Sequence, residues 1–135
     1  MTAGTFAYVD ASAFVKLVVP EPESDAMTRA IAEWPRAVSS ALLTVEVRRA
    51  GTRAGADRIG IERALAAVTL LPVTAEVRER AAGLPPPGLR TLEALHLASA
   101  LLVRTELGAF FAYDRRLADA AAAAGLEAQS PQPSG

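Results

Sequence analysis

Two apolar runs in the chain each end on an aspartate. The segments TFAYV at 5–9 and GAFFAY at 108–113 are short and rich in aromatic residues, and each predicts a buried β-strand. Around them, apolar residues recur at helical spacing in segments bounded by Ser, Thr, Pro or Gly. The pattern predicts further short strands at 36–39, 71–73 and 126–128, and helices at 11–19, 24–34, 42–50, 61–70, 74–82, 91–104 and 116–124.

The alternation of short strands with helices is typical of a parallel sheet covered by helices on both faces. We therefore predict an α/β fold, a three-layer α/β/α sandwich with a central parallel sheet. The stretch PPPG at 85–88 predicts a rigid loop, because proline is excluded from helix interiors and central strands. We expect one domain over residues 1–128 and a flexible C-terminal tail, QSPQPSG, at 129–135.

The charge balance limits the classes of partner. The chain has 14 basic and 15 acidic residues, a net charge of −1 at pH 7 and no cysteine. A protein that coats nucleic acid through general electrostatics is strongly basic, so any nucleic-acid contact must be local. The lack of cysteine excludes a disulfide scaffold. With no apolar stretch of membrane-spanning length and no basic start of a signal peptide, we expect a cytoplasmic protein.

Asp10 and Asp114 share one context, because each ends an apolar strand, in FAYVD and FFAYD. Ligands of open parallel sheets bind at the carboxyl ends of the strands. The two carboxylates converge there only if their strands are neighbours in the sheet. The alternative is that each aspartate caps the helix that follows it, a position that aspartate favours. One aspartate can do both.

Two glutamates lie on predicted helices that are otherwise apolar. Glu46 adjoins an apolar stripe, where an acid loses hydration unless a partner compensates it. The alternative for Glu46 is an ion pair with Arg49 on the same helix. Glu93 falls in the first turn of a helix that we expect Thr91 to cap, and the helix dipole favours negative charge there.

Several other chemistries find no support in the sequence. The sole histidine, His96, lies among leucines, and we expect a structural, partly buried role for it. Ser12 has no histidine partner nearby, which argues against Ser-His-Asp catalysis. The glycines form no phosphate-binding loop. A haloacid-dehalogenase-like site needs D-x-D where this chain has Ser12, and a receiver domain needs a late lysine, whereas the only lysine is Lys16.

Four blocks, taken in order, resemble the motifs of PIN-domain ribonucleases, and most of all those of VapC-type toxins from bacterial toxin–antitoxin pairs. The blocks are YVDASAFVKL, SSALLTVEVRRA, LRTLEALHLASAL and FFAYDRRLADAAAAAGL. The resemblance implies a three-layer fold and an endoribonuclease that uses Mg²⁺ or Mn²⁺ to hydrolyse RNA, with transfer or ribosomal RNA as substrate. It also implies a VapB-like antitoxin partner and a homodimer.

The same resemblance assigns roles to individual residues. The catalytic, metal-binding acids would be Asp10, Glu46, Glu93 and Asp114. Clustered carboxylates repel one another, and a hard divalent cation removes that penalty while accepting their oxygens as ligands. Ser12 would support Asp10 through a hydrogen bond, and Arg115 and Arg116 would contact RNA phosphate.

Two positions depart from the family pattern. Glu93 stands where the family ordinarily carries Asp, and its side chain is one methylene longer, which can displace an oxygen ligand. Ala112 stands where Thr or Ser is frequent, and it lacks their hydroxyl. These departures define an alternative function: a PIN-fold module that binds antitoxin, metal or RNA without efficient turnover.

Overall fold

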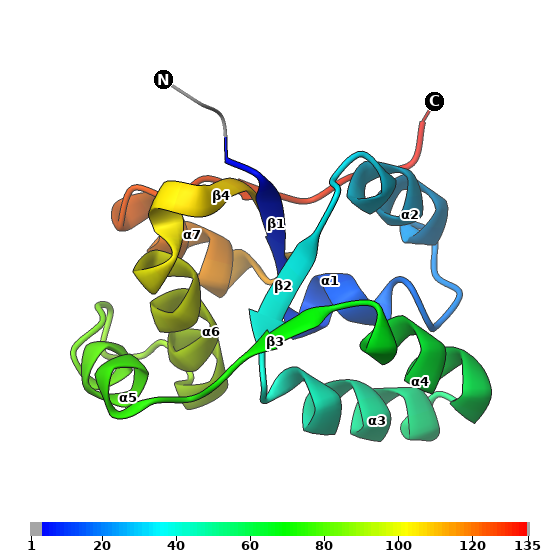
Figure 1. The fold of residues 1–135 in the computed structure, drawn as a ribbon, viewed down its shortest axis with the longest axis horizontal. Coiled ribbons are helices and arrows are strands. Elements are labelled where there is room, and N and C mark those ends of the chain that lie inside the picture. The colour runs from blue at the N-terminus through cyan, green and yellow to red at the C-terminus, as the bar shows by residue number, and fades with distance from the viewer. Residues whose placement is uncertain (1–3, 135) are drawn as a thin grey trace.

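The computed structural model describes residues 4–134 of the chain (Figure 1). A five-stranded, wholly parallel sheet lies at its centre, with strand order β3-β2-β1-β4-β5. The strands are β1 (Phe6–Val9), β2 (Ala37–Ser40), β3 (Thr69–Leu71), β4 (Leu107–Phe111) and β5 (Ala128–Gln129). Helices cover both faces, which confirms the predicted three-layer sandwich. Within this part of the chain, no helix is long and apolar enough to cross a membrane.

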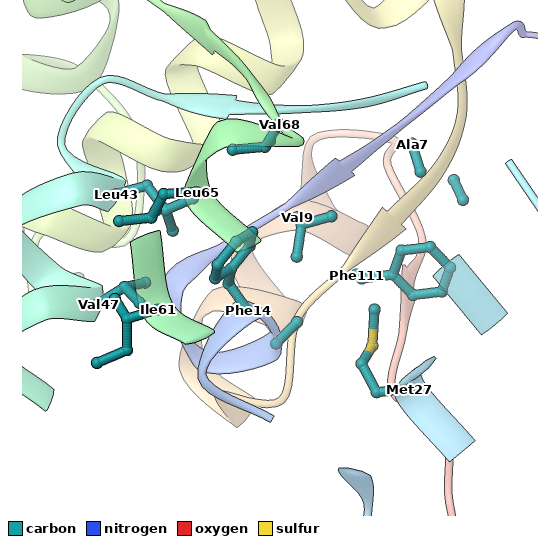
Figure 2. Close-up of a cluster of buried hydrophobic side chains, with 12 residues drawn as sticks. Ala7, Val9, Phe14, Met27, Leu43, Val47, Ile61, Leu65, Val68 and Phe111 are labelled. Carbon is teal, nitrogen blue, oxygen red and sulfur yellow. The ribbon is translucent and has the colours of Figure 1, made fainter. Parts of the chain in front are cut away.

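Alternate strand side chains face two separate hydrophobic clusters. Val9 and Phe111 pack with the helices of the first face (Figure 2). These helices are α1 (Ala11–Val15), α2 (Ser24–Ala32), α3 (Leu43–Arg53) and α4 (Arg58–Ala66). Tyr8 and Phe110 pack on the second face with α6 (Thr91–Leu102) and α7 (Arg115–Ala123), and α5 (Ala75–Ala82) lies against α6. A 3-10 turn, η1 (Arg104–Glu106), leads into β4. The two-residue period of the strands thus decides which side chains reach each layer.

Most predicted boundaries differ from the structure by one to four residues, and two of these shifts have a clear physical cause. The strand expected at 71–73 lies earlier, at Thr69–Leu71, because Pro72 has no N–H to donate to the sheet. The helix expected at 61–70 begins earlier, at Arg58, because the Asp57 carboxylate accepts a hydrogen bond from the Gly60 N–H at 3.0 Å and caps it. Neither shift moves a candidate site residue.

The C-terminal segment, expected to be a flexible tail at 129–135, makes contacts with the rest of the protein. Gln129 lies in the edge strand β5, and its carbonyl accepts a hydrogen bond from the Ala112 N–H at 3.1 Å. The Tyr113 hydroxyl donates to the Pro131 carbonyl at 2.6 Å. These contacts place the first part of the segment against β4, whereas Gly135 lies outside the described residues.

Close packing of Trp34 on Gly108 makes the start of β4 sensitive to side-chain volume. A Cβ atom built on Gly108 would lie 2.2 Å from the Cη2 and Cζ3 atoms of the Trp34 ring. We therefore expect Gly108→Ala to lower the free energy of unfolding by about 1–3 kcal/mol, the usual cost of overpacking. Gly88→Ala is the control, because nothing lies within 4 Å of a Cβ there. Urea unfolding measures both variants, and equal stabilities would contradict the expected clash.

Candidate active site

The strand order reverses next to β1. From β1 the sheet continues through β2 and β3 in one direction, and β4 and β5 lie on the other side. Val9 pairs with Phe111, and the N–H of Asp10 donates to the Phe111 carbonyl at 3.1 Å. The strands that precede Asp10 and Asp114 are therefore neighbours, which is the condition the sequence left open. Their carboxyl ends form the switch point at which open parallel sheets bind ligands.

The four acids singled out from the sequence line one cavity at this switch point. The cavity has a volume of about 200 Å³, and its lining residues are Asp10, Ala11, Ser12, Glu46, Arg90, Glu93, His96, Asp114 and Leu117. A larger hollow of about 490 Å³ between α5 and α6 is lined by no acidic side chain. Sequence reasoning missed Arg90 as a lining residue. It also placed Arg115 and Arg116 near the site, but both are exposed on the first turn of α7 and outside the lining.

Asp10 lies at the buried end of the cavity, with 3 % of its surface exposed. Its Oδ1 accepts a hydrogen bond from the Ala13 N–H at 2.9 Å, so Asp10 caps α1 as well as facing the cavity. The Ser12 hydroxyl donates to Asp10, at 2.7 Å from Oδ1, and accepts from the Tyr113 N–H at 2.8 Å. Ser12 therefore connects the end of β1 to the segment that follows β4.

Burial raises the pKa of Asp10 from 3.8 to about 6, although nearby His96 and the hydrogen bonds from Ala13 and Ser12 oppose this shift. Within residues 4–134, no lysine or arginine forms an ion pair with Asp10. The ionised carboxylate thus carries a desolvation penalty that the protein compensates only in part. A cation in the cavity would complete the compensation.

Glu46 contacts His96 rather than an arginine of its own helix. His96 Nε2 lies 2.6 Å from Glu46 Oε1, and His96 Nδ1 lies 2.8 Å from the Tyr8 hydroxyl. Among the described residues, the Glu46–Arg49 ion pair considered from the sequence is absent. His96 is buried, as expected, but its ring also reaches the cavity, which a purely structural histidine does not do.

Glu93 and Asp114 lie next to each other in the cavity, and both are less buried than Asp10. Glu93 Oε1 accepts a hydrogen bond from the Arg90 N–H at 3.2 Å, so α6 is capped at Arg90 and not at Thr91 as predicted. Asp114 accepts from the Leu117 N–H at 3.1 Å and caps α7. Partial burial and a hydrogen bond to Asp114 raise the pKa of Glu93. Partial burial opposes ionisation of Asp114 too, but the Leu117 N–H and Glu93 lower its pKa below the usual value.

The donor chemistry of the cavity suits a hard divalent cation. All four acids offer carboxylate oxygens, the ligands that Mg²⁺ and Mn²⁺ prefer. Within residues 4–134, no three His, Asp or Glu side chains are arranged to hold a metal ion as they stand. Asp10, Glu46 and Glu93 each contact a protein partner through a carboxylate oxygen. The residues therefore fit such an ion through the chemistry of their oxygen atoms.

Comparisons with known proteins show which family this chain is similar to. The family model described as "PIN domain" matches residues 7–123. Ribonuclease VapC46 of Mycobacterium tuberculosis is 46% identical over 125 residues, which cover 92% of this chain and 96% of the relative. Ribonuclease VapC35 of the same species is 36% identical over 133 residues, with the same coverage of both chains.

Solved structures give the same fold. The crystal structure of M. tuberculosis VapC20, described as a sarcin-ricin loop cleaving toxin, superposes with a TM-score of 0.69 at 20% identity and covers 94% of this chain and 99% of that one. A PilT N-terminus domain protein from Sulfolobus solfataricus superposes with a TM-score of 0.56 at 15% identity, covering 93% of this chain and 86% of that one.

Proposed function

Since this chain belongs to the PIN-domain family as a VapC-type toxin, we propose that it is an endoribonuclease that hydrolyses RNA with Mg²⁺ or Mn²⁺ at the carboxylate cavity. The observation that carries the proposal is the convergence of four acids from separate elements on one cavity at the switch point of the sheet. Helix capping accounts for Asp10, Glu93 and Asp114 one by one, but it does not require four acids to meet, and their repulsion and burial destabilise the fold.

The proposal gives each side chain of the cavity a distinct task. Asp10, Glu46, Glu93 and Asp114 would hold the metal ion through their oxygens. When bound, Mg²⁺ or Mn²⁺ supplies a Lewis acid that lowers the pKa of water and offsets negative charge at a phosphodiester. Ser12 holds Asp10 in place by its hydroxyl. The reaction then needs no nucleophilic side chain.

The proposed substrate contacts are local, in line with the net charge of −1. Arg90 lines the cavity and can bind a phosphate beside the acids. Arg115 and Arg116 follow Asp114 directly and are exposed, so they can contact phosphates farther along an RNA strand. We assign transfer or ribosomal RNA as the substrate class, a VapB-like antitoxin as partner and a homodimer as the assembly, all from family membership.

A second candidate function is a PIN-fold module with impaired turnover. One observation favours it: the Glu93 carboxylate, which replaces the usual Asp, is bound back to the Arg90 N–H. A carboxylate that caps a helix is less free to serve a metal ion. The substitutions at Glu93 described in the Discussion separate the two functions.

The proposed function is tested by cleavage of a structured-RNA pool in Mn²⁺ and in chelator. We expect cleavage in Mn²⁺ only, and a loss of more than about 100-fold in Asp114→Asn, because removing even an outer-shell partner of a metal site costs 10–100-fold. Asp119→Asn is the matched control, since Asp119 lies exposed on the same helix. Cleavage that persists in chelator, or equal loss in both variants, would exclude the proposed site.

A further inference from the structure

Both ring nitrogens of His96 are engaged, although the reaction as proposed above does not use this residue. Nδ1 lies 2.8 Å from the Tyr8 hydroxyl, and Nε2 lies 2.6 Å from Glu46 Oε1. The Tyr8 ring also meets the imidazole edge-on, with ring centroids 5.8 Å apart. His96 and Tyr8 are 2 % and 0 % exposed. A histidine held on both sides in this way has one orientation.

The direction of the hydrogen bond to Glu46 follows from the chemistry of the partners. An ionised carboxylate only accepts hydrogen bonds, so Nε2 carries a proton whether the ring is neutral or charged. Burial raises the pKa of Tyr8, which keeps its hydroxyl protonated and able to donate to Nδ1 of a neutral ring. The chain Tyr8–His96–Glu46 therefore connects the buried middle of β1, through α6, to the acid on α3.

The contact leaves one oxygen of Glu46 available. Within residues 4–134, His96 is the only hydrogen-bond partner of the Glu46 side chain, and it uses Oε1. Glu46 lies near the start of α3. The side chain of an exposed glutamate has several rotatable bonds and samples many rotamers. A fixed donor on Oε1 restricts those rotamers and holds Oε2 in a defined place in the cavity that Asp10 and Asp114 also line.

We propose that His96 is a positioning residue: anchored by Tyr8, it holds Glu46 through Oε1 so that Oε2 is preorganised for a divalent metal ion. The inference rests on the proposed function, because it assigns the Glu46 carboxylate to that ion. Outer-shell histidines and carboxylates that orient a ligand in this way typically change metal affinity by 10–100-fold.

Two substitutions at His96 separate the contact with Glu46 from general packing. In His96→Gln the amide nitrogen reaches the place of Nε2 and can still donate to Glu46, whereas in His96→Asn the shorter amide reaches only the place of Nδ1. Calorimetric titration with Mn²⁺ measures affinity, and thermal unfolding in chelator measures stability. We expect His96→Asn to weaken Mn²⁺ binding by about 10–100-fold and His96→Gln to weaken it by less than about 3-fold, with similar loss of stability in both.

Two further variants, Tyr8→Phe and Leu101→Val, test the inference if His96→Asn does not fold. Tyr8→Phe removes only the anchoring hydroxyl and is expected to weaken Mn²⁺ binding measurably. Leu101 is buried on the same helix and does not line the cavity, so Leu101→Val removes packing but no hydrogen-bond donor and is expected to bind Mn²⁺ as the unaltered protein does.

The outcomes distinguish this inference from the proposed function. Unchanged Mn²⁺ affinity in His96→Asn, or in Tyr8→Phe where His96→Asn does not fold, overturns the positioning role alone. Equal weakening in His96→Gln and His96→Asn also overturns it, because the donor to Glu46 would then not matter. Failure of the unaltered protein to bind Mn²⁺ overturns the proposed metal site and this inference with it.

Discussion

Replacing Asp10 with asparagine is expected to abolish RNA cleavage and, in the absence of metal, to make the protein more stable at pH 7. The two effects have one origin, the burial of a carboxylate that only a cation compensates fully. Asparagine has the same shape, and its Oδ1 can still accept the hydrogen bond from the Ala13 N–H. It carries no charge, so it avoids the desolvation penalty and cannot replace an anionic ligand.

The stability difference depends on pH in a defined direction. The pKa of Asp10 is about 6 in the folded protein and 3.8 in an ordinary aspartate, so folding favours the protonated form. The protein therefore loses stability as pH rises from about 4 to about 6, by roughly 1–3 kcal/mol in all. Asp10→Asn lacks this loss. Urea unfolding in chelator between pH 3.5 and about 8 should show equal stabilities at the acidic end and a more stable variant above pH 6.

Asp10→Asn should weaken metal binding and RNA cleavage, although it raises stability in the absence of metal. Mn²⁺ stabilises a protein that binds it by mass action, by about 2.7 kcal/mol at 100 times the dissociation constant. We expect this stabilisation in the unaltered protein and its loss in Asp10→Asn, with cleavage reduced by more than about 100-fold. Asp25→Asn, an exposed position on α2, is the control. A less stable Asp10→Asn at pH 7, or an undiminished Mn²⁺ effect, would contradict the assigned role.

Two substitutions at Glu93 are expected to separate the effect of side-chain charge on RNA cleavage from the effect of side-chain length. Glu93→Gln keeps the length of the side chain and its hydrogen bond to the Arg90 N–H, as glutamine does in capping boxes, but removes the charge. Glu93→Asp keeps the charge and loses the reach to Arg90. We expect cleavage to fall by more than about 100-fold in Glu93→Gln and to change by less than about 10-fold in Glu93→Asp.

The reason is that the Glu93 carboxylate already lies in the cavity beside Asp114, so the extra methylene has not removed it from the site. Glu93→Asp should be the less stable of the two variants, because only this variant loses the hydrogen bond to the Arg90 N–H. Cleavage assays in Mn²⁺ and thermal unfolding in chelator measure the two properties. A gain of more than about 100-fold in Glu93→Asp would instead favour the impaired module, because the longer side chain would then be what limits turnover.

Much of the fold follows from local sequence. The apolar runs that end at Asp10 and Asp114 identify the two central strands, because buried parallel strands are short and almost wholly apolar. Thr74 begins the helix predicted at 74–82, and it caps α5 because its hydroxyl accepts a hydrogen bond from the Val77 N–H at 3.2 Å. Capping and strand burial depend on neighbours within a few residues, so sequence patterns capture them. Two of the errors arise at Pro72, which has no N–H to donate to the sheet, and at Arg90, an N-cap whose side chain offers no acceptor.

The sequence alone determined the four acids of the cavity and the kind of fold that carries them. Only the tertiary structure decided how they are paired. Glu46 was left between an ion pair with Arg49 and a site role, and its partner proved to be His96, 50 positions farther along the chain. No local pattern encodes a contact between α3 and α6, because it depends on both helices packing around the same strand ends. The same packing buries Asp10, which raises its pKa, and turns a histidine among leucines toward the site.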